Sequence, residues 1–439
     1  MQQKRIRELF KRYQLWIWGS LFAIFAYYAS FKSHIITAIP ATYWMQIYSF
    51  KDYSSWEAFK DYLIHLRTGI PPALSCLEIL SYNLLGGSEW IFKGLYRKAI
   101  IAVLILPVFF SKKKWGEMLW CLGMAYVCFE SIILIHKGNP QYYDILLPLF
   151  ILVYFLCSRF TFQPTQSKRL KLLSVMLAGF CLTMAELARP FMIAIVPFLV
   201  ALNLYHYIRE RYWAGVVVFM LPILLFSISW HVKLWHYNEH QVIWSNSSGT
   251  NLFRAWSGFV DQEAMNQELM EEAPPVLPGR WENLNTQIHY ENSQIRKQYV
   301  IQGIKQQPKA ALQHLWNKTL LFTRPRTDMY ANDPQTPVLS VYRVVVKGLF
   351  ILLPLLLVYT LVRTLRNPRM LAEVEIWLIL TTAFISVMPV IGELGEEARF
   401  VISVIPLLIV CGMLGMRELK GWINLENIQS WLLPLKKNR

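Results

Sequence analysis

The sequence predicts an all-α polytopic membrane protein with about ten transmembrane helices, amphipathic helices in a first outer loop and a small, mostly helical outer domain. The chain has 439 residues, of which 55% are hydrophobic and only 16% charged, whereas soluble domains average about 25% charged residues. Apolar runs of about 20 residues, the length of helix that crosses a bilayer, recur along the whole chain. These runs are continuous rather than alternating, which excludes a transmembrane β-barrel.

Ten apolar segments are predicted to span the membrane. They are residues 14–31, 91–110, 116–135, 142–157, 172–188, 190–206, 213–230, 341–362, 373–391 and 400–415. The basic clusters between them, from MQQKRIRELFKRY to the tail LKKNR, all fall on one side if the first span leaves the cytoplasm, and they hold half of the 44 Lys and Arg. This bias predicts that both termini are cytoplasmic. The net charge of +16 is then explained by topology and contact with anionic lipid, and nucleic acid is not an expected partner.

Several classes of cofactor and processing are not indicated. The amino-terminal span has no small-residue cleavage site after it and is interpreted as a retained anchor. The six cysteines are scattered without a CxxC motif, so they are interpreted as buried apolar residues rather than zinc ligands or disulfides. No Gly-rich phosphate loop is present, which argues against ATP-driven chemistry. We expect no cofactor; a divalent metal between carboxylates is conceivable, but no ligand spacing indicates one.

The chain divides into an amino-terminal transmembrane module (1–230) with a first outer loop (32–90), an outer domain (231–340), and carboxyl-terminal helices with a cytoplasmic tail (341–439). In the first outer loop, SSWEAFKDYLIHLRTG is predicted to form an interfacial helix that a Pro-Pro pair ends. The next stretch, ALSCLEILSYNLL, is short and polar and is predicted to lie in the membrane surface. Were it to span instead, the sidedness of everything after it would change.

Ionisable residues gather at the ends of the predicted spans on the outer face. They are Asp52 and Glu57 in the first outer loop, Asp144 in HKGNPQYYD, Glu186 and Arg189 in AELARP, and Glu396, Glu397 and Arg399 in GELGEEARF. Ionisable groups at membrane depth are costly and usually face a cavity or each other. Their common side therefore predicts a shared polar cleft at the outer membrane surface.

Each of these residues also has a structural interpretation. Glu186 and Arg189 are three residues apart and could pair along one helix. Asp144 could cap the amino end of the next helix, Asp52 could be a solvated loop carboxylate, and Arg399 could extend to the lipid headgroups and pair with a neighbouring glutamate. The shared side is what favours a functional interpretation.

Four sequence segments together resemble the GT-C superfamily of polytopic glycosyltransferases, in particular its bacterial members of the protein mannosyltransferase and lipid A aminoarabinose transferase type. The segments are RTGIPPALSCLEILSYNLLGGSEWIFKGLYR, IWSNSSGTNLFRAW, IKQQPKAALQHLWNKTLLFTRP and EARFVISVIP. Each segment is short and degenerate, but they follow one another in the family's order, so that the resemblance extends over most of the chain. Two features depart from the family pattern: the first acid, Asp52, comes some 20 residues after the first span, and Ser403 stands where a proline is common.

The resemblance implies an inverting transfer of a sugar from a polyprenyl-phosphate donor to a glycan, lipid or protein acceptor at the outer face of a bacterial inner membrane. It assigns the general base to Asp52, with Glu57 as the alternative, and the donor phosphate to Arg399 with Arg189 as a second contact. Asp144 and Glu397 would orient the acceptor or the sugar, and Glu396 and Glu397 would keep Arg399 aimed. Glu186 is a further candidate for substrate binding.

Three other functions stay open at this point. A transporter or lipid flippase would be expected to show broken helices at the midplane and internal repeats, and neither is evident in the sequence. A glycan polymerase or ligase would share the compartment and the lipid-linked substrate. A non-catalytic assembly protein could use the same fold.

Overall fold

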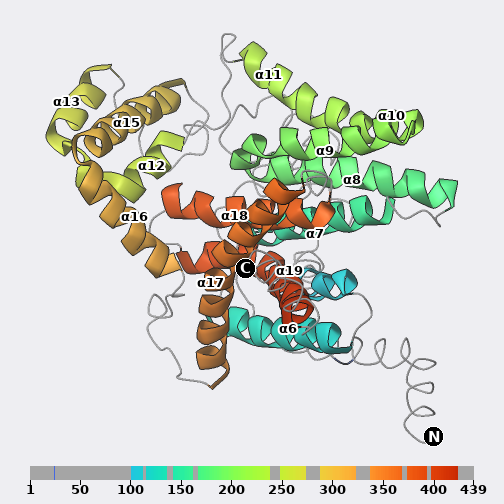
Figure 1. Ribbon diagram of the computed structural model, residues 1–439. Coiled ribbons are helices and arrows are strands. Elements are labelled where there is room, and N and C mark those ends of the chain that lie inside the picture. Colours follow the sequence, from blue (N-terminus) through green and yellow to red (C-terminus); the bar gives the residue numbers. More distant parts are fainter. Residues whose placement is uncertain are drawn as a thin grey trace, which may run out of the picture.

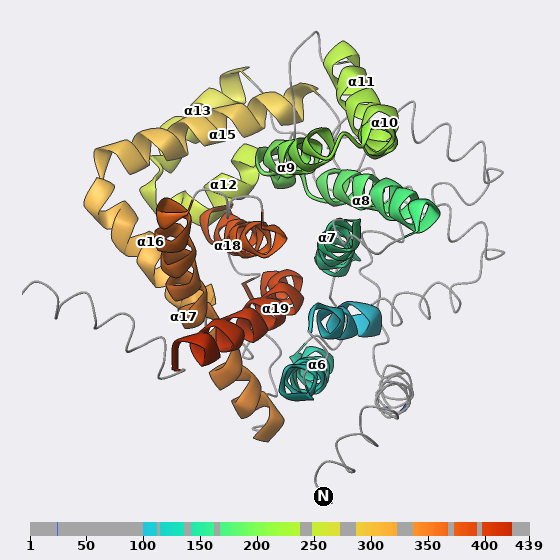
Figure 2. The same ribbon diagram turned by 45° about the vertical axis from the view of Figure 1, so that its right-hand side comes forward.

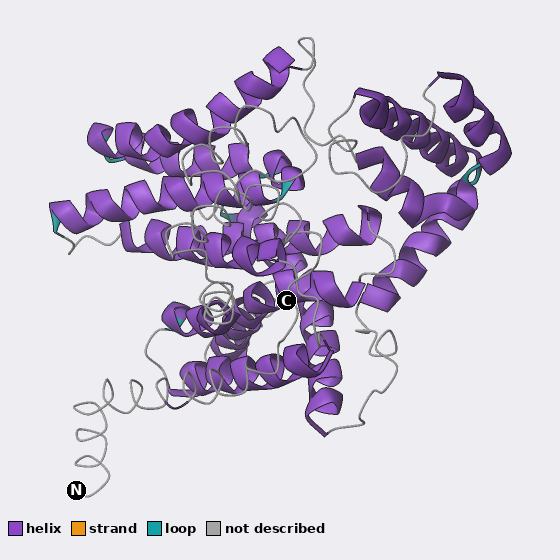
Figure 3. Cartoon of the chain, turned by 180° about the vertical axis from the view of Figure 1, so that it is seen from behind, coloured by secondary structure: helices purple, strands orange, loops and turns teal. Residues whose placement is uncertain are grey.

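The computed structural model describes residue 24 and residues 100–111, 115–135, 142–161, 167–237, 248–272, 287–322, 337–367, 373–392 and 397–423. Within these ranges the chain is helical and contains no strand (Figure 3). The predicted first span apart from residue 24, the first outer loop with Asp52 and Glu57, and Glu396 lie outside the described residues.

The described elements before residue 240 include two 3-10 segments, η2 (Leu106–Phe110) and η3 (Pro190–Ala194), and the π-helix η4 (Ile223–Ile228). The α-helices in this part are α6 (Trp115–Ile135), α7 (Tyr142–Thr161), α8 (Lys168–Ala188), α9 (Val196–Arg209), α10 (Trp213–Pro222) and α11 (Ser229–Tyr237). The elements that follow are α12 (Ser248–Trp256), η5 (Ser257–Phe259), α13 (Gln262–Glu272), α15 (Gln287–Gln306), α16 (Pro308–Phe322), α17 (Pro337–Arg366), α18 (Val374–Gly392) and α19 (Glu397–Ile423). Every predicted span from residue 116 onward coincides with one or more of these elements.

Four of the described helical stretches are long and apolar enough to cross a membrane: residues 168–188, 213–236, 340–366 and 374–392. Their outer faces agree with that interpretation. Along α17, large apolar side chains such as Val344, Leu355 and Leu365 are 63–73% exposed, and Val217 on α10 is 67% exposed. A continuous exposed apolar face of this kind needs a hydrocarbon environment to cover it. The described part is therefore that of a polytopic helical membrane protein.

The helix formed by α10, η4 and α11 packs closely on α8. A Cβ atom added at Gly179 of α8 would lie 2.3 Å from the carbonyl oxygen of Phe219 on α10, so only glycine allows this approach. Directly after this contact, Pro222 ends α10 and the π-helical turns of η4 begin. Proline removes a helical hydrogen bond, and π-turns frequently mark functional sites. This irregularity within an apolar span was not expected from the sequence.

Contacts between charged side chains show how the helices are directed. The carboxyl end of α7 lies beside the amino end of α18, because Arg159 Nε is 4.0 Å from Glu375 Oε1. The carboxyl half of α19 lies beside the amino end of α6, because Arg417 donates to both carboxylate oxygens of Glu117 at 3.2 and 2.8 Å. We call this the Arg417 end of the bundle.

The opposite end is called the Glu186 end. Helix α8 begins near the carboxyl end of α7 and packs along it, so that Glu186 lies at the far end of the bundle. α11 reaches the same end, since His231 is hydrogen-bonded to Glu186. The amino ends of α7 and α19 and the carboxyl end of α18 lie at this end because their other ends meet at Arg417.

Helices α12, α13, α15 and α16, with η5, form a helical unit to one side of the bundle (Figures 1 and 2). Two small hydrophobic clusters hold the unit together, one around Trp256 and Val300 and the other around Met265 and Ile295. The unit packs against the ends of α18 and α19 through α12 and α16. It falls within the predicted outer domain of residues 231–340.

Candidate functional site

The structure brings the backbones of most predicted site residues to one end of the bundle. Asp144 lies in the first turn of α7, and Glu397 and Arg399 lie in the first turn of α19. Both of these turns are at the Glu186 end. There Glu186 lies in the last turn of α8, and Arg189 directly follows this helix. The side chains of Asp144, Glu397 and Arg399 lie outside the described part, so their roles stay predictions.

Glu186 is the predicted site residue whose side chain has the clearest surroundings. Its side chain is only 2% exposed, and one carboxylate oxygen is 2.5 Å from Nε2 of His231 on α11. The other oxygen, Oε2, is buried and has no hydrogen-bond partner in the part of the chain that the structure describes. Burying a carboxylate oxygen without a partner is costly, so this atom is available to accept a hydrogen bond.

The expected helical pairing of Glu186 with Arg189 does not form, because α8 ends between them. Helix α8 stops at Ala188, and Arg189 has extended backbone angles (φ −140°, ψ 109°). The cause is local: Arg189 precedes Pro190, and a residue before proline is disfavoured in the α-helical region. Proline then starts the short helix η3. The carboxylate of Glu186 contacts His231 rather than following the i,i+3 pattern.

His231 is a site residue that sequence reasoning missed. It directly follows the predicted span 213–230, and its side chain is 24% exposed. The available signal was a polar residue at the end of an apolar span, on the same predicted side as Glu186. Which nitrogen of the ring carries the proton depends on the tautomer.

The helical unit is joined to the bundle at the same end. The indole Nε1 of Trp256, the last residue of α12, donates a hydrogen bond of 2.7 Å to the carbonyl oxygen of Ile391. Ile391 is the penultimate residue of α18 and comes directly before GELGEEARF. His314 of α16 packs against the Trp256 ring at 4.9 Å and lies 2.9 Å from the carbonyl oxygen of Ala255. The carboxyl end of α18 is thus anchored beside the helical unit.

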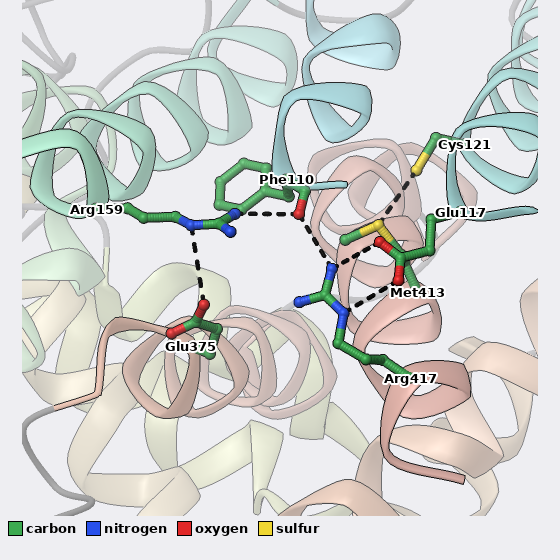
Figure 4. Close-up of polar contacts among 7 residues, drawn as sticks. All are labelled: Phe110, Glu117, Cys121, Arg159, Glu375, Met413 and Arg417. Carbon is green, nitrogen blue, oxygen red and sulfur yellow. Dashed lines mark hydrogen bonds and ion pairs between the residues drawn. The ribbon is translucent and has the colours of Figure 1, made fainter. Parts of the chain in front are cut away.

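The Arg417 end carries a different arrangement of charges (Figure 4). The carbonyl oxygen of Phe110 accepts hydrogen bonds from Arg159 at 3.1 Å and from Arg417 at 3.3 Å. Arg417 also forms a two-pronged ion pair with the buried carboxylate of Glu117. This network satisfies its members mutually and ties η2, α6, α7 and α19 together. We interpret it as structural.

The cysteines agree with the sequence interpretation where they are described. Cys121, Cys128, Cys181 and Cys411 are buried and Cys157 is partly buried, all as free thiols. Cys121 is 3.8 Å from the sulfur of Met413, and Cys411 is 3.5 Å from the hydroxyl of Thr382. Among the described residues, no group of three or more His, Cys, Asp or Glu side chains could hold a metal ion.

Comparisons with known proteins give one structural likeness. No protein-family model matches the chain, and no curated protein matches it. The crystal structure of ArnT from Cupriavidus metallidurans bound to undecaprenyl phosphate matches with 15% sequence identity and a TM-score of 0.36. The match covers 91% of this chain and 77% of that chain. At this level of similarity no residue role or ligand is transferred from that structure.

Proposed function

We propose that this chain is a membrane glycosyltransferase that moves a sugar from a polyprenyl-phosphate donor to an acceptor at the outer face of a bacterial inner membrane. The acceptor is a hydroxyl-bearing glycan, lipid or protein. The proposal places the Glu186 end of the bundle on the outer side, in accord with the distribution of basic residues between the spans. The lipid donor and the inverting outcome follow from the sequence resemblance.

The observation that carries the proposal is that independent parts of the chain deliver candidate residues to one end of the bundle. The backbone positions of Asp144, Glu186, Arg189 and Arg399, on or directly after α7, α8 and α19, lie at the Glu186 end and support the proposal. The helical unit is anchored there as well, through Trp256. Ionisable groups concentrated at one membrane face, next to a folded extramembrane unit, suit a reaction between a lipid-borne donor and an acceptor outside the bilayer.

The chemistry requires few groups. A sugar linked to a lipid phosphate already has a leaving group, so the protein supplies a base for the acceptor hydroxyl and positive charge for the departing phosphate. In the proposal Asp52, or Glu57 in its place, takes the hydroxyl proton. The oxygen then bonds to the anomeric carbon as the bond to phosphate breaks. Arg399 holds the phosphate, because a guanidinium fork matches phosphate geometry.

The described pair gives Glu186 a more specific role in this scheme. Oε1 is held by His231, which fixes the carboxylate, while Oε2 stays able to accept a hydrogen bond. We assign it to a hydroxyl of the sugar or of the acceptor. Asp144, Glu396 and Glu397 would orient the same substrates or Arg399.

The experiment is a transfer assay on purified protein with radiolabelled polyprenyl-phosphate sugars and a membrane extract as acceptor. Wild type is compared with Asp52→Asn and Arg399→Ala, and with Glu210→Gln as a matched control at the Arg417 end, where that carboxylate is exposed. We expect label to move with wild type and with the control but not with the two site variants.

Two other outcomes are informative. Transfer that survives in Asp52→Asn moves the base to Glu57 or Asp144 and leaves the reaction class intact. Failure of folded wild-type protein to move any sugar from any lipid donor would overturn the proposal.

A further inference from the structure

The face of the helical unit where α12 and α15 pack together carries two arginines that have no carboxylate partner among the described residues. Arg254 is an exposed residue of α12, and Arg296 is a half-buried residue of α15. In the described part of the chain neither forms an ion pair. Arginines that are held close together without an anion repel each other, so an arrangement of this kind needs a reason.

The two helices are held in a fixed relation at this point. The backbone N–H of Gly249 donates to the hydroxyl of the buried Ser293 at 2.9 Å. A Cβ at Gly249 would lie 1.7 Å from the carbonyl oxygen of Ser293, so the backbones touch and only glycine fits. Arg296 is one helical turn after Ser293, which places its guanidinium on α12 rather than in solvent.

The guanidinium of Arg296 is held in place but only partly used. Its Nη1 is 3.3 Å from the hydroxyl of Thr250, and its central carbon is 5.8 Å from the centre of the Phe253 ring. Nε of Arg296 is buried and has no hydrogen-bond partner among the described residues. Arginine has five N–H donors in a rigid fork, and a buried donor without a partner is costly.

Arg254 lies beside this group. It follows Thr250 by four residues on α12, so the two side chains are neighbours along one helix face. Burial, and secondarily the charge of Arg254, lower the pKa of Arg296 from its ordinary value. Two cations with unused donors on one face create a local positive potential that attracts anions.

We propose that Arg254 and Arg296, with the hydroxyl of Thr250, form a binding site for a phosphate-type oxyanion on the helical unit, presented either by an anionic lipid headgroup or by a soluble phosphate compound. Phosphate suits the site because it accepts several charge-assisted hydrogen bonds at once and neutralises both guanidiniums. The site is built from residues of the helical unit alone, none of which the proposed transfer uses, so it stands whether or not the chain transfers a sugar.

The test measures binding to the full-length protein in zwitterionic nanodiscs. In one arm, inorganic pyrophosphate is titrated into the sample. In the other arm, nanodiscs containing phosphatidylglycerol replace the zwitterionic ones. The readout is the unfolding midpoint of the protein, since a ligand of the native state raises it. We expect Arg296→Gln to weaken the response at least about tenfold in apparent Kd. Arg254→Gln is expected to weaken it less, because that side chain is exposed.

Controls separate this site from general electrostatics. Lys305→Gln removes the same charge from an exposed position of α15 and should leave binding within about twofold of wild type. Arg296→Lys keeps the charge but loses the fork, and it should bind with intermediate affinity. A response to both probes identifies the phosphate group as sufficient, and a response to phosphatidylglycerol alone identifies a lipid headgroup.

Two results would overturn the proposal. One is an absence of response in wild type to either probe. The other is equal binding by Lys305→Gln and both arginine variants. Should Arg296→Gln fail to fold, Arg254→Gln alone carries the comparison, because an exposed arginine without an ion pair contributes little to stability.

Discussion

The two ends of the bundle treat buried charge in opposite ways. At the Arg417 end the Glu117 carboxylate accepts from Arg417 with both oxygens, and Arg417 also bonds to a backbone carbonyl. At the Glu186 end the carboxylate of Glu186 uses one oxygen for His231 and leaves the other without a hydrogen bond in the described structure.

This difference separates a structural contact from a candidate functional one. A buried acid whose oxygens are all bonded within the protein has no capacity left for a ligand. A buried acid with a fixed orientation and an unused oxygen has that capacity, and its cost must be offset elsewhere in the fold. The comparison predicts that substitutions at the two ends affect different properties: stability at the Arg417 end and activity at the Glu186 end.

The largest effect on stability is expected for Glu117→Leu. The substitution leaves Arg417, whose side chain is only 12% exposed, as an unpaired buried cation, and we expect a loss of about 3–5 kcal/mol in the free energy of unfolding. The measurement is denaturant unfolding of the purified protein in detergent. Adding Arg417→Met should restore most of the loss, because a buried ion pair can be replaced by apolar residues. If the double variant is as unstable as Glu117→Leu alone, the loss of stability does not come from leaving Arg417 unpaired.

Glu186→Gln should lower the transfer activity but leave the stability of the protein nearly unchanged. The amide has the shape of the carboxylate but not its charge, so a hydrogen bond to a bound substrate would be weakened by about 1.5–3 kcal/mol. Sugar transfer should fall by about ten- to a hundredfold, while the unfolding midpoint stays close to that of wild type. The transfer assay described above measures this, with Glu210→Gln as the control. Unchanged transfer would remove Glu186 from the proposed site.

Trp256→Phe should loosen the helical unit from the bundle. The ring volume is largely kept, but the carbonyl of Ile391 loses its 2.7 Å hydrogen bond, and we expect a local cost of about 1–2 kcal/mol. Amide hydrogen exchange in α12 and in the last turn of α18 should become faster, by about tenfold. Trp213→Phe, at a position that is 62% exposed, is the matched control. Equal exchange in the two variants would show that this contact does not hold the unit in place.

The smallest effect is expected for Lys171→Met. Lys171 Nζ is 3.0 Å from Glu210 Oε2, but the two side chains are 23% and 41% exposed. Exposed ion pairs are typically worth less than about 1 kcal/mol, so the unfolding free energy should change by less than that amount. A loss as large as that of Glu117→Leu would remove the distinction between buried and exposed charge on which the comparison rests.

The positions of the helices could be predicted from the sequence because they depend on local patterns. The segment predicted as residues 172–188 is helical as Lys168–Ala188, since its apolar run ends at an Arg-Pro pair. The segment predicted as residues 373–391 is helical as Val374–Gly392, since its apolar run ends at Gly392. Four of the described stretches also meet the length and hydropathy expected of a membrane span.

The partners of charged residues could not be predicted, because they depend on packing between distant segments. Arg417 and Glu117 are 300 positions apart in the chain, and His231 and Glu186 are 45 apart. The structural alternative for Glu186 is pairing with Arg189, its near neighbour in sequence, and the end of α8 removes that geometry. The proposed base residues, Asp52 and Glu57, lie outside the described residues and stay predictions.

The π-helical segment Ile223–Ile228 sets the angular phase between two halves of one span. A π-turn accommodates about one residue more than an α-turn, and one residue corresponds to a rotation of about 100° around an α-helix. An uninterrupted α-helix could therefore not direct both Phe219 of α10 toward Gly179 and His231 of α11 toward Glu186. Deleting the exposed Leu225 would let the span become regular, and either Phe219 would turn away from Gly179 or His231 would turn away from Glu186. The number of residues in this span is thus as constrained as their chemical identity. A single-residue deletion on its lipid-facing side would change the Glu186 end without altering any residue there. Cysteine cross-linking between α8 and α11 would detect this change.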